Sequence, residues 1–234
     1  ELGAPNELDD KEVLAAQDAT GLEIHGVVDS VHWRKPFSDP DPKVRAEGMD
    51  ALKTAIDKAK LYGADTVLLV PAVVNKDVSY SFAYKQSQEE IRKALPYAED
   101  RGIKIALENV WNNFLLSPVE MVRYIDEFES PLVGAYFDCG NIVRYGWPVH
   151  WIEALGERIF KVHVKAYSRE IQNKEGPRAG FRVEMGDGDI DWSSISNALV
   201  KAGYKSWVTS EVRGGDKARL VDVKQRMDNI LKLA

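Results

Sequence analysis

The stretch FKVHVK, residues 160–165, alternates strictly between apolar side chains and charged or polar ones. Side chains alternate between the two faces of a β-strand, so this stretch predicts a strand with one apolar face and one ionisable face. The apolar face holds Phe160, Val162 and Val164, and the ionisable face holds Lys161, His163 and Lys165. In an open parallel sheet covered by helices on both sides, both faces are expected to be apolar. The ionisable face instead favours a strand that lines the lumen of a closed barrel.

The rest of the chain repeats a rhythm of short strands and longer amphipathic helices, which is typical of a parallel α/β fold. Several other predicted strands also have one polar face. The expected strands are 22–28, 66–70, 103–108, 132–138, 159–165 and 207–212, and the expected helices are 43–62, 79–101, 118–128, 151–155, 192–202 and 218–233.

We therefore predict an α/β fold of the (β/α)8 TIM-barrel type, with residues 1–234 as a single domain. A barrel of this type has eight strands, so two strands remain to be identified besides these six. Glu1 and Leu2 could end one of them, and the other, with its helix, would lie upstream of a chain that begins without methionine. The expected barrel thus lacks its first strand and helix and most of its second strand.

Composition narrows the class of partner. The net charge of −6 argues against nucleic acid, and no apolar run reaches the roughly 18 residues of a membrane span. Cys139 is the single cysteine, which excludes an internal disulfide and makes a cysteine-based zinc site implausible. We expect a cytoplasmic protein that acts on small molecules and could form a homo-oligomer, although missing upstream sequence could have held a targeting signal.

Four ligand-type residues occupy equivalent places on successive predicted strands. Glu108, Asp138, His163 and Glu211 each lie on the polar face of their strand, at its end or one step before it. In a barrel these positions meet at the C-terminal mouth, where barrel enzymes carry out their chemistry. Three carboxylates held together repel one another unless a cation sits among them. Carboxylate oxygens and an imidazole suit one divalent ion, Mn²⁺, Mg²⁺, Co²⁺ or Zn²⁺.

Weaker candidates for substrate contacts lie in loops that follow two of the predicted strands. His32 and Trp33 follow the first predicted strand, and the flat ring of Trp33 could cover a sugar. Asn109 follows Glu108 and could bind hydroxyl groups, or could simply shape a turn. The stretch GDGDIDW, residues 186–192, lacks the spacing of a phosphate-binding loop, and we expect a turn in which Asp191 caps the following helix.

Five short motifs, in this order and spacing, resemble the xylose-isomerase-like TIM-barrel superfamily, in its sugar and sugar-phosphate isomerase and epimerase branch. They are ALENV (106–110), FDCGN (137–141), KVHVK (161–165), GDGDIDW (186–192) and TSEV (209–212). The resemblance implies that the metal ligands of that family correspond to Glu108, Asp138, His163 and Glu211, and its two catalytic glutamates to Glu108 and Glu211. It also implies that Arg169 binds substrate oxygens.

The sequence departs from the ketose 3-epimerases of that superfamily at two positions. Asn141 stands where those enzymes often carry histidine, and Phe114 stands where they carry a glutamate that contacts the substrate. Asn141 remains a candidate substrate contact. Lys165, in HVK, could hold a terminal oxygen or a phosphate of the substrate, or could form a structural salt bridge inside the barrel. These features are more similar to the sugar-phosphate or dehydratase-like branches.

The function implied is a metal-dependent isomerase or epimerase of a sugar, a sugar phosphate or a related keto-polyol. One glutamate would remove a proton next to the substrate carbonyl, the ion would stabilise the enediolate, and a second group would return a proton. Alternatives stay open: a dehydratase on the same scaffold, similar to inosose dehydratase, or a non-catalytic barrel subunit. A phosphodiesterase similar to endonuclease IV is disfavoured, because four histidines are few for a site of three metals.

Overall fold

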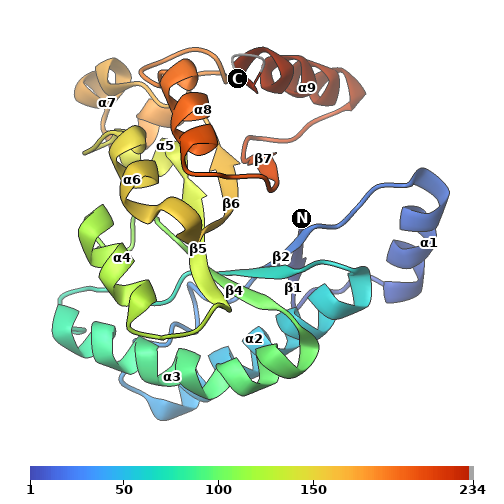
Figure 1. Ribbon diagram of the computed structural model, residues 1–234, viewed down its shortest axis with the longest axis vertical. Coiled ribbons are helices and arrows are strands. Elements are labelled where there is room, and N and C mark those ends of the chain that lie inside the picture. The colour runs from blue at the N-terminus through green and yellow to red at the C-terminus, as the bar shows by residue number, and fades with distance from the viewer. Residues whose placement is uncertain (232–234) are drawn as a thin grey trace. The chain divides into compact units, whose positions relative to one another are not determined.

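The computed structural model describes residues 1–231, along which strands and helices alternate (Figure 1). The chain forms two compact units: the first comprises residues 1–116 and 124–134, and the second comprises 117–123 and the chain from 135 on. The first unit contains β1 (Leu2–Ala4), α1 (Asp10–Thr20), β2 (Gly26–Asp29), α2 (Pro42–Tyr62), β3 (Thr66–Leu69), α3 (Tyr80–Arg101) and β4 (Lys104–Glu108). Two further elements, α4 (Pro118–Asp126) and β5 (Val133–Asp138), contribute residues to both units.

In the first unit, β1, β2, β3 and β4 pair in sequence order and are parallel. Val27 of β2 lies opposite Val67 of β3, which in turn lies opposite Ile105 of β4. All three side chains are buried. This buried row fixes the register, because a slip by one residue would turn each apolar set to the opposite face.

The helices α2 and α3 pack against each other (Figure 1), and a polar residue caps the start of each helix. The Asp41 carboxylate accepts a hydrogen bond from the Lys43 N–H (2.8 Å) at the start of α2, and Ser79 caps α3 in the same way. Gly63 ends α2 in the left-handed conformation (φ 79°), which glycine adopts without steric cost.

The second unit contains the remaining strands and helices. β5, β6 (Ile159–Val164) and β7 (Val208–Ser210) pair in this order and are parallel. The helices are α5 (Cys139–Val143), α6 (Pro148–Leu155), α7 (Arg169–Glu175), α8 (Trp192–Lys201) and α9 (Lys217–Leu231), with 3₁₀ segments η1 (Gly156–Arg158) and η2 (Pro177–Phe181). Among residues 1–231, no helix has both the length and the apolar character that crossing a membrane requires.

Most predicted elements are found within a few residues of their expected limits, but three differences matter. The strand predicted at 22–28 begins only at Gly26, so His25 precedes it. Leu22 is 71% exposed, so this apolar residue does not belong to a buried strand face. The helix predicted at 151–155 begins at Pro148. The helix predicted at 218–233 runs over Lys217–Leu231, and residues 232–233 lie outside the described part of the chain.

The GDGDIDW segment is a turn, as predicted, and it supports the loop after β6. Asp191 caps α8 by accepting a hydrogen bond from the Ser194 N–H (3.1 Å). Gly188 has a φ of 88°, and a Cβ at this position would lie 2.4 Å from the Tyr167 carbonyl oxygen. Glycine is therefore required here, since any side chain would collide with the neighbouring backbone. Asp189 N–H donates to the same Tyr167 oxygen (2.9 Å).

Asp29 ends β2 as a buried carboxyl group, with a side chain that is 1% exposed. Burial raises the pKa of Asp29 to about 6, although its carboxylate accepts a hydrogen bond from the Val31 N–H (3.0 Å). A folded-state pKa above the usual value of 3.8 means that the protonated form stabilises the fold. This contribution is fully present below pH 3.8 and is lost as the pH rises through about 6.

Replacing Asp29 with Asn keeps the acceptor oxygen and removes the ionisation. Because one pKa unit corresponds to about 1.4 kcal/mol, we expect the advantage of Asp29→Asn over the parent chain in free energy of unfolding to grow by about 2 kcal/mol between pH 4.5 and 7.5. Urea denaturation at both pH values measures this difference. Asp50→Asn, at an exposed position of α2, is the control. An equal difference at the two pH values would contradict the prediction.

Candidate metal centre

Three of the predicted ligands meet at the carboxyl ends of β5, β6 and β7 in the second unit. Asp138, His163 and Glu211 each offer a ligand atom, and these atoms lie within 4.8 Å of one another. The strand ladder explains the meeting: Asp138 lies directly opposite His163 in the paired strands. Glu211 follows β7, and its N–H donates to the Val164 carbonyl oxygen (2.9 Å). Main-chain pairing therefore places all three side chains.

Asp138 is completely buried and its two oxygens have different partners. Oδ1 accepts a hydrogen bond from the Asn141 N–H (2.7 Å), which caps the short helix α5. Oδ2 lies 3.0 Å from the ammonium nitrogen of Lys165. The backbone N–H of Asn141 thus fixes the orientation of the carboxylate through one oxygen, and the other oxygen faces the positive charge of Lys165.

His163 is also buried, with 3% of its surface exposed. Its ring lies against Tyr136, with 4.4 Å between the ring centroids. Its Nδ1 atom lies 3.5 Å from Glu211 Oε2. The packed tyrosine ring limits how far the imidazole can turn, so His163 keeps this nitrogen directed toward the carboxylate.

Lys165 supplies the positive charge that the two carboxylates need. Its Nζ atom donates to Glu211 Oε2 (2.6 Å) and lies 3.0 Å from Asp138 Oδ2. Partial desolvation of Glu211 opposes its ionisation, but the ammonium of Lys165, the contact with Asp138 and the imidazole together outweigh it and hold the pKa of Glu211 below its usual value. Gly140 permits this arrangement, because a Cβ there would lie 2.4 Å from Lys165 Cγ.

The donor set fits a divalent cation. Two carboxylates and one imidazole are ligand types that Mn²⁺, Mg²⁺, Co²⁺ and Zn²⁺ accept. The ammonium of Lys165 contacts the carboxylates of both Asp138 and Glu211. An ion that binds these carboxylates has to displace the ammonium or share them with it. The neighbouring thiol of Cys139 is fully buried, and burial raises its pKa well above the usual value.

The fourth predicted ligand, Glu108, belongs to the first unit. It is the last residue of β4, and its side chain is buried (8% exposed). Asn109 follows it and is buried as well. Phe114, at the position where ketose 3-epimerases carry a glutamate, packs against Tyr80, with 5.2 Å between the ring centroids.

The predicted candidates in the loop after β2 have distinct surroundings. His32 is buried, and its Nδ1 atom accepts a hydrogen bond from the Val70 N–H (3.2 Å). Burial lowers the pKa of His32 to about 4, which keeps the ring neutral at physiological pH. Trp33 is 49% exposed and meets the His32 ring edge-on at a centroid distance of 6.0 Å. Trp33 therefore offers a free aromatic surface, whereas His32 is anchored to the chain.

Arg169 is engaged with the main chain. Its guanidinium donates to the Val143 oxygen (2.8 Å) and the Gly146 oxygen (2.6 Å) and lies over the Trp147 ring. These contacts tie the start of α7 to the segment between α5 and α6. In the described structure, Arg169 thus holds a loop, a role that sequence reasoning did not anticipate.

Comparisons with known proteins bear on the fold and on the class of relative. A family model described as xylose isomerase-like TIM barrel matches residues 3–232. The putative L-ribulose-5-phosphate 3-epimerase SgbU of Escherichia coli K12 is 28% identical over 200 residues, covering 82% of this chain and 67% of that protein. L-ribulose-5-phosphate 3-epimerase UlaE of Escherichia coli O1:K1 / APEC is 25% identical over 190 residues, covering 79% and 63%. This chain spans about two thirds of the length of these relatives.

Solved structures show the same fold. A D-tagatose 3-epimerase-like protein has a TM-score of 0.81 at 22% identity, covering 96% of this chain and 82% of that one. The IolI protein, determined with a bound zinc atom, has a TM-score of 0.80 at 18% identity, covering 99% and 87%. The barrel fold class predicted from strand patterning is thereby confirmed, and the relatives are sugar epimerases.

Replacing Lys165 with Met removes the ammonium and keeps an unbranched stem of similar length. A unit positive charge 3.0 Å from Asp138 and 2.6 Å from Glu211 opposes a second cation at the same carboxylates. We therefore expect Lys165→Met to bind Mn²⁺ about tenfold more tightly or better, measured by isothermal titration calorimetry at low ionic strength. Lys174→Met, on the exposed face of α7, should leave Mn²⁺ binding unchanged. Unchanged affinity in Lys165→Met would show that the ammonium does not compete with the ion.

Proposed function

Because the chain belongs to the xylose isomerase-like TIM-barrel family, we propose that it is a divalent-metal-dependent epimerase or isomerase of a ketose or ketose phosphate. The observation that carries the proposal is the convergence of Asp138, His163 and Glu211 at the carboxyl ends of three paired strands. The zinc bound to the structurally similar IolI protein supports a metal in this cluster.

Glu108 completes the proposed ligand set. It ends β4 as Asp138 ends β5, and the resemblance of ALENV to the family supports a ligand at this position. Together, Glu108, Asp138, His163 and Glu211 supply three carboxylates and one imidazole. When bound, a divalent ion polarises a substrate carbonyl and makes the neighbouring C–H more acidic.

The two glutamates carry the proton transfers in this proposal. One carboxylate takes the proton from the carbon beside the carbonyl and becomes a carboxylic acid, and the other group returns a proton to that carbon from the opposite face. The result is inversion at one carbon. Glu211 suits such a role because its side chain is 48% exposed while one oxygen is held by Lys165.

The remaining predicted substrate contacts stay part of the proposal, each because of its own chemistry. Lys165 can bind a substrate oxygen once an ion has taken over the carboxylates that it now contacts. Trp33 offers an exposed ring that a sugar can cover. The other proposed contacts are His32, Asn109 and Asn141. Arg169 also stays a proposed contact to substrate oxygens, and in the described structure its guanidinium donates to two main-chain carbonyls.

The proposal predicts exchange of a substrate carbon-bound hydrogen with solvent. The full chain with Mn²⁺ should convert L-ribulose 5-phosphate, D-tagatose or D-psicose in D₂O to a product that carries one deuterium at the inverted carbon, read by NMR and mass spectrometry. Glu211→Gln and Glu108→Gln should lower the exchange rate by about 10² to 10⁴, the usual contribution of a positioned acid or base.

Glu153→Gln, at an exposed position of α6, is the matched control and should retain activity. Circular dichroism of each variant checks that the fold is kept. A product that has lost a water molecule would replace the epimerase proposal with a dehydratase. Absence of deuterium from all three ketoses, with Mn²⁺ bound to the protein, would refute both proton-transfer reactions.

A further inference from the structure

A cavity of about 560 Å³ opens beside the candidate metal centre, entirely within the second unit. Its walls come from the residues just after β6, from the end of η2 and the residues after it, from the segment between β7 and α9, and from Arg219 of α9. Lys165 and Glu211 form the part of the wall that belongs to the metal centre. A volume of this size is within the range of small-molecule sites.

The ionisable side chains that line the cavity are predominantly cationic, although the whole chain has a net charge of −6. Four are basic and two are acidic: Lys165, Arg182, Arg213 and Arg219, with Glu184 and Glu211. Both acids already have basic partners. Lys165 binds Glu211 (2.6 Å), and Arg219 binds Glu184 (2.8 Å). The cavity therefore presents uncompensated positive charge.

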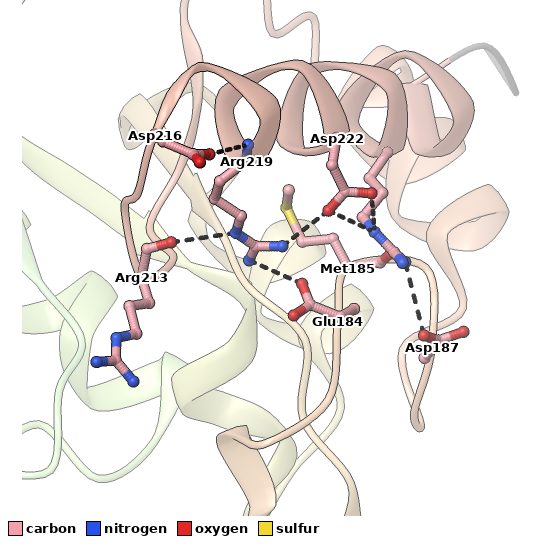
Figure 2. Close-up of polar contacts among 8 residues, drawn as sticks. Glu184, Met185, Asp187, Arg213, Asp216, Arg219 and Asp222 are labelled. Atoms are coloured by element: carbon pink, nitrogen blue, oxygen red, sulfur yellow. Dashed lines mark hydrogen bonds and ion pairs between the residues drawn. The ribbon is translucent and has the colours of Figure 1, made fainter.

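Arg213 is the clearest source of that charge. Arg182 pairs with Glu175 (2.6 Å), and Arg219 pairs with Asp222 (2.8 Å) as well as with Glu184. Among residues 1–231, the guanidinium of Arg213 has neither a hydrogen bond nor an ion pair with the protein. Figure 2 shows it turned away from the ion pairs around Arg219.

The backbone of Arg213 is nevertheless fixed. Its carbonyl oxygen accepts a hydrogen bond from Arg219 Nε (3.3 Å), and Asp216 accepts one from the Arg219 N–H (2.9 Å), as Figure 2 shows. A Cβ at Gly215 would lie 2.8 Å from Arg219 Cβ, so this loop packs closely on the first turn of α9. The fixed loop holds Arg213 two residues after Glu211, on the wall of the same cavity.

A guanidinium that pairs with no other group among residues 1–231 and lines a predominantly cationic cavity is suited to bind an anionic ligand. Arginine matches the tetrahedral oxygens of phosphate with paired, charge-assisted hydrogen bonds. The guanidinium of Arg169, the residue expected to hold substrate oxygens, donates hydrogen bonds to two main-chain carbonyls. Arg169 does not line this cavity. Among the described basic residues that line this cavity, Arg213 is the one whose guanidinium has no protein partner.

We propose that Arg213 binds the phosphate of a phosphorylated ketose in this cavity while the reacting carbons lie at the metal centre. The proposal rests on the function proposed above and narrows its substrate class to sugar phosphates. Lys165 then lies between the two sites, since it lines the cavity and contacts both Asp138 and Glu211.

Direct binding tests the cavity without any turnover. The full chain, kept metal-free with a chelator at low ionic strength, is titrated with inorganic phosphate and followed by ³¹P NMR and calorimetry. We expect Arg213→Ala to weaken phosphate binding about 10- to 100-fold and Arg213→Lys to weaken it less. Arg178→Ala, an exposed arginine of η2 outside the cavity, should bind like the parent chain. Equal phosphate affinity in the parent chain and Arg213→Ala overturns the proposal.

Kinetics then separates this proposal from the proposed function. With Mn²⁺ present, Arg213→Ala should lower kcat/KM for L-ribulose 5-phosphate about 10- to 100-fold and leave kcat/KM for L-ribulose within about twofold. Equal effects on both substrates would overturn the Arg213 assignment while the epimerase function stands. If Arg213→Ala loses phosphate binding and the parent chain turns over neither ketose, the proposed function is overturned while the anion site stands. Tighter binding of a sugar carboxylate than of the sugar phosphate would overturn the choice of phosphate.

Discussion

Repulsion between neighbouring carboxylates, and its relief by a cation, is the interaction on which the candidate centre depends. Asp138 is fully buried and Glu211 lies beside it, with His163 as the third member of the cluster. Burying a carboxylate without a counter-charge costs several kcal/mol. In the described structure Lys165 supplies that charge at 3.0 and 2.6 Å. The same electrostatic requirement makes the cluster suitable for a divalent ion.

The parallel ladder turns this requirement into a defined geometry. β5 and β6 place Asp138 opposite His163, and a backbone hydrogen bond to Val164 places Glu211. Sites built on strands are held more rigidly than sites built on loops. The arginine proposed for the substrate phosphate comes instead from the segment after β7, and its position depends on the ion pairs of Arg219. Within the second unit, the candidate metal ligands and the proposed phosphate contact thus come from structurally different segments.

Strand periodicity made much of this predictable. Alternation by two residues assigns Asp138 and His163 to polar faces near the ends of their strands, and Glu211 keeps that parity although β7 ends at Ser210. Other features leave no such trace. α1 has no buried residue, so its sequence carries no stripe of apolar residues from which the helix could be predicted. Arg213 and Arg169 are the same residue type, and only the structure of residues 1–231 distinguishes them: within it the guanidinium of Arg169 donates to carbonyls and that of Arg213 has no partner.

Asp138 shows how closely architecture and chemistry are joined in this chain. One oxygen starts a helix by accepting the Asn141 N–H, and the other faces the cationic side of the cluster. Asparagine could perform the first task but would bring no charge to the second, and glutamate could bring the charge but would place its oxygens one bond farther from the helix start. Evolution at this position is therefore constrained twice over: drift toward a new activity would first have to find another way to begin α5.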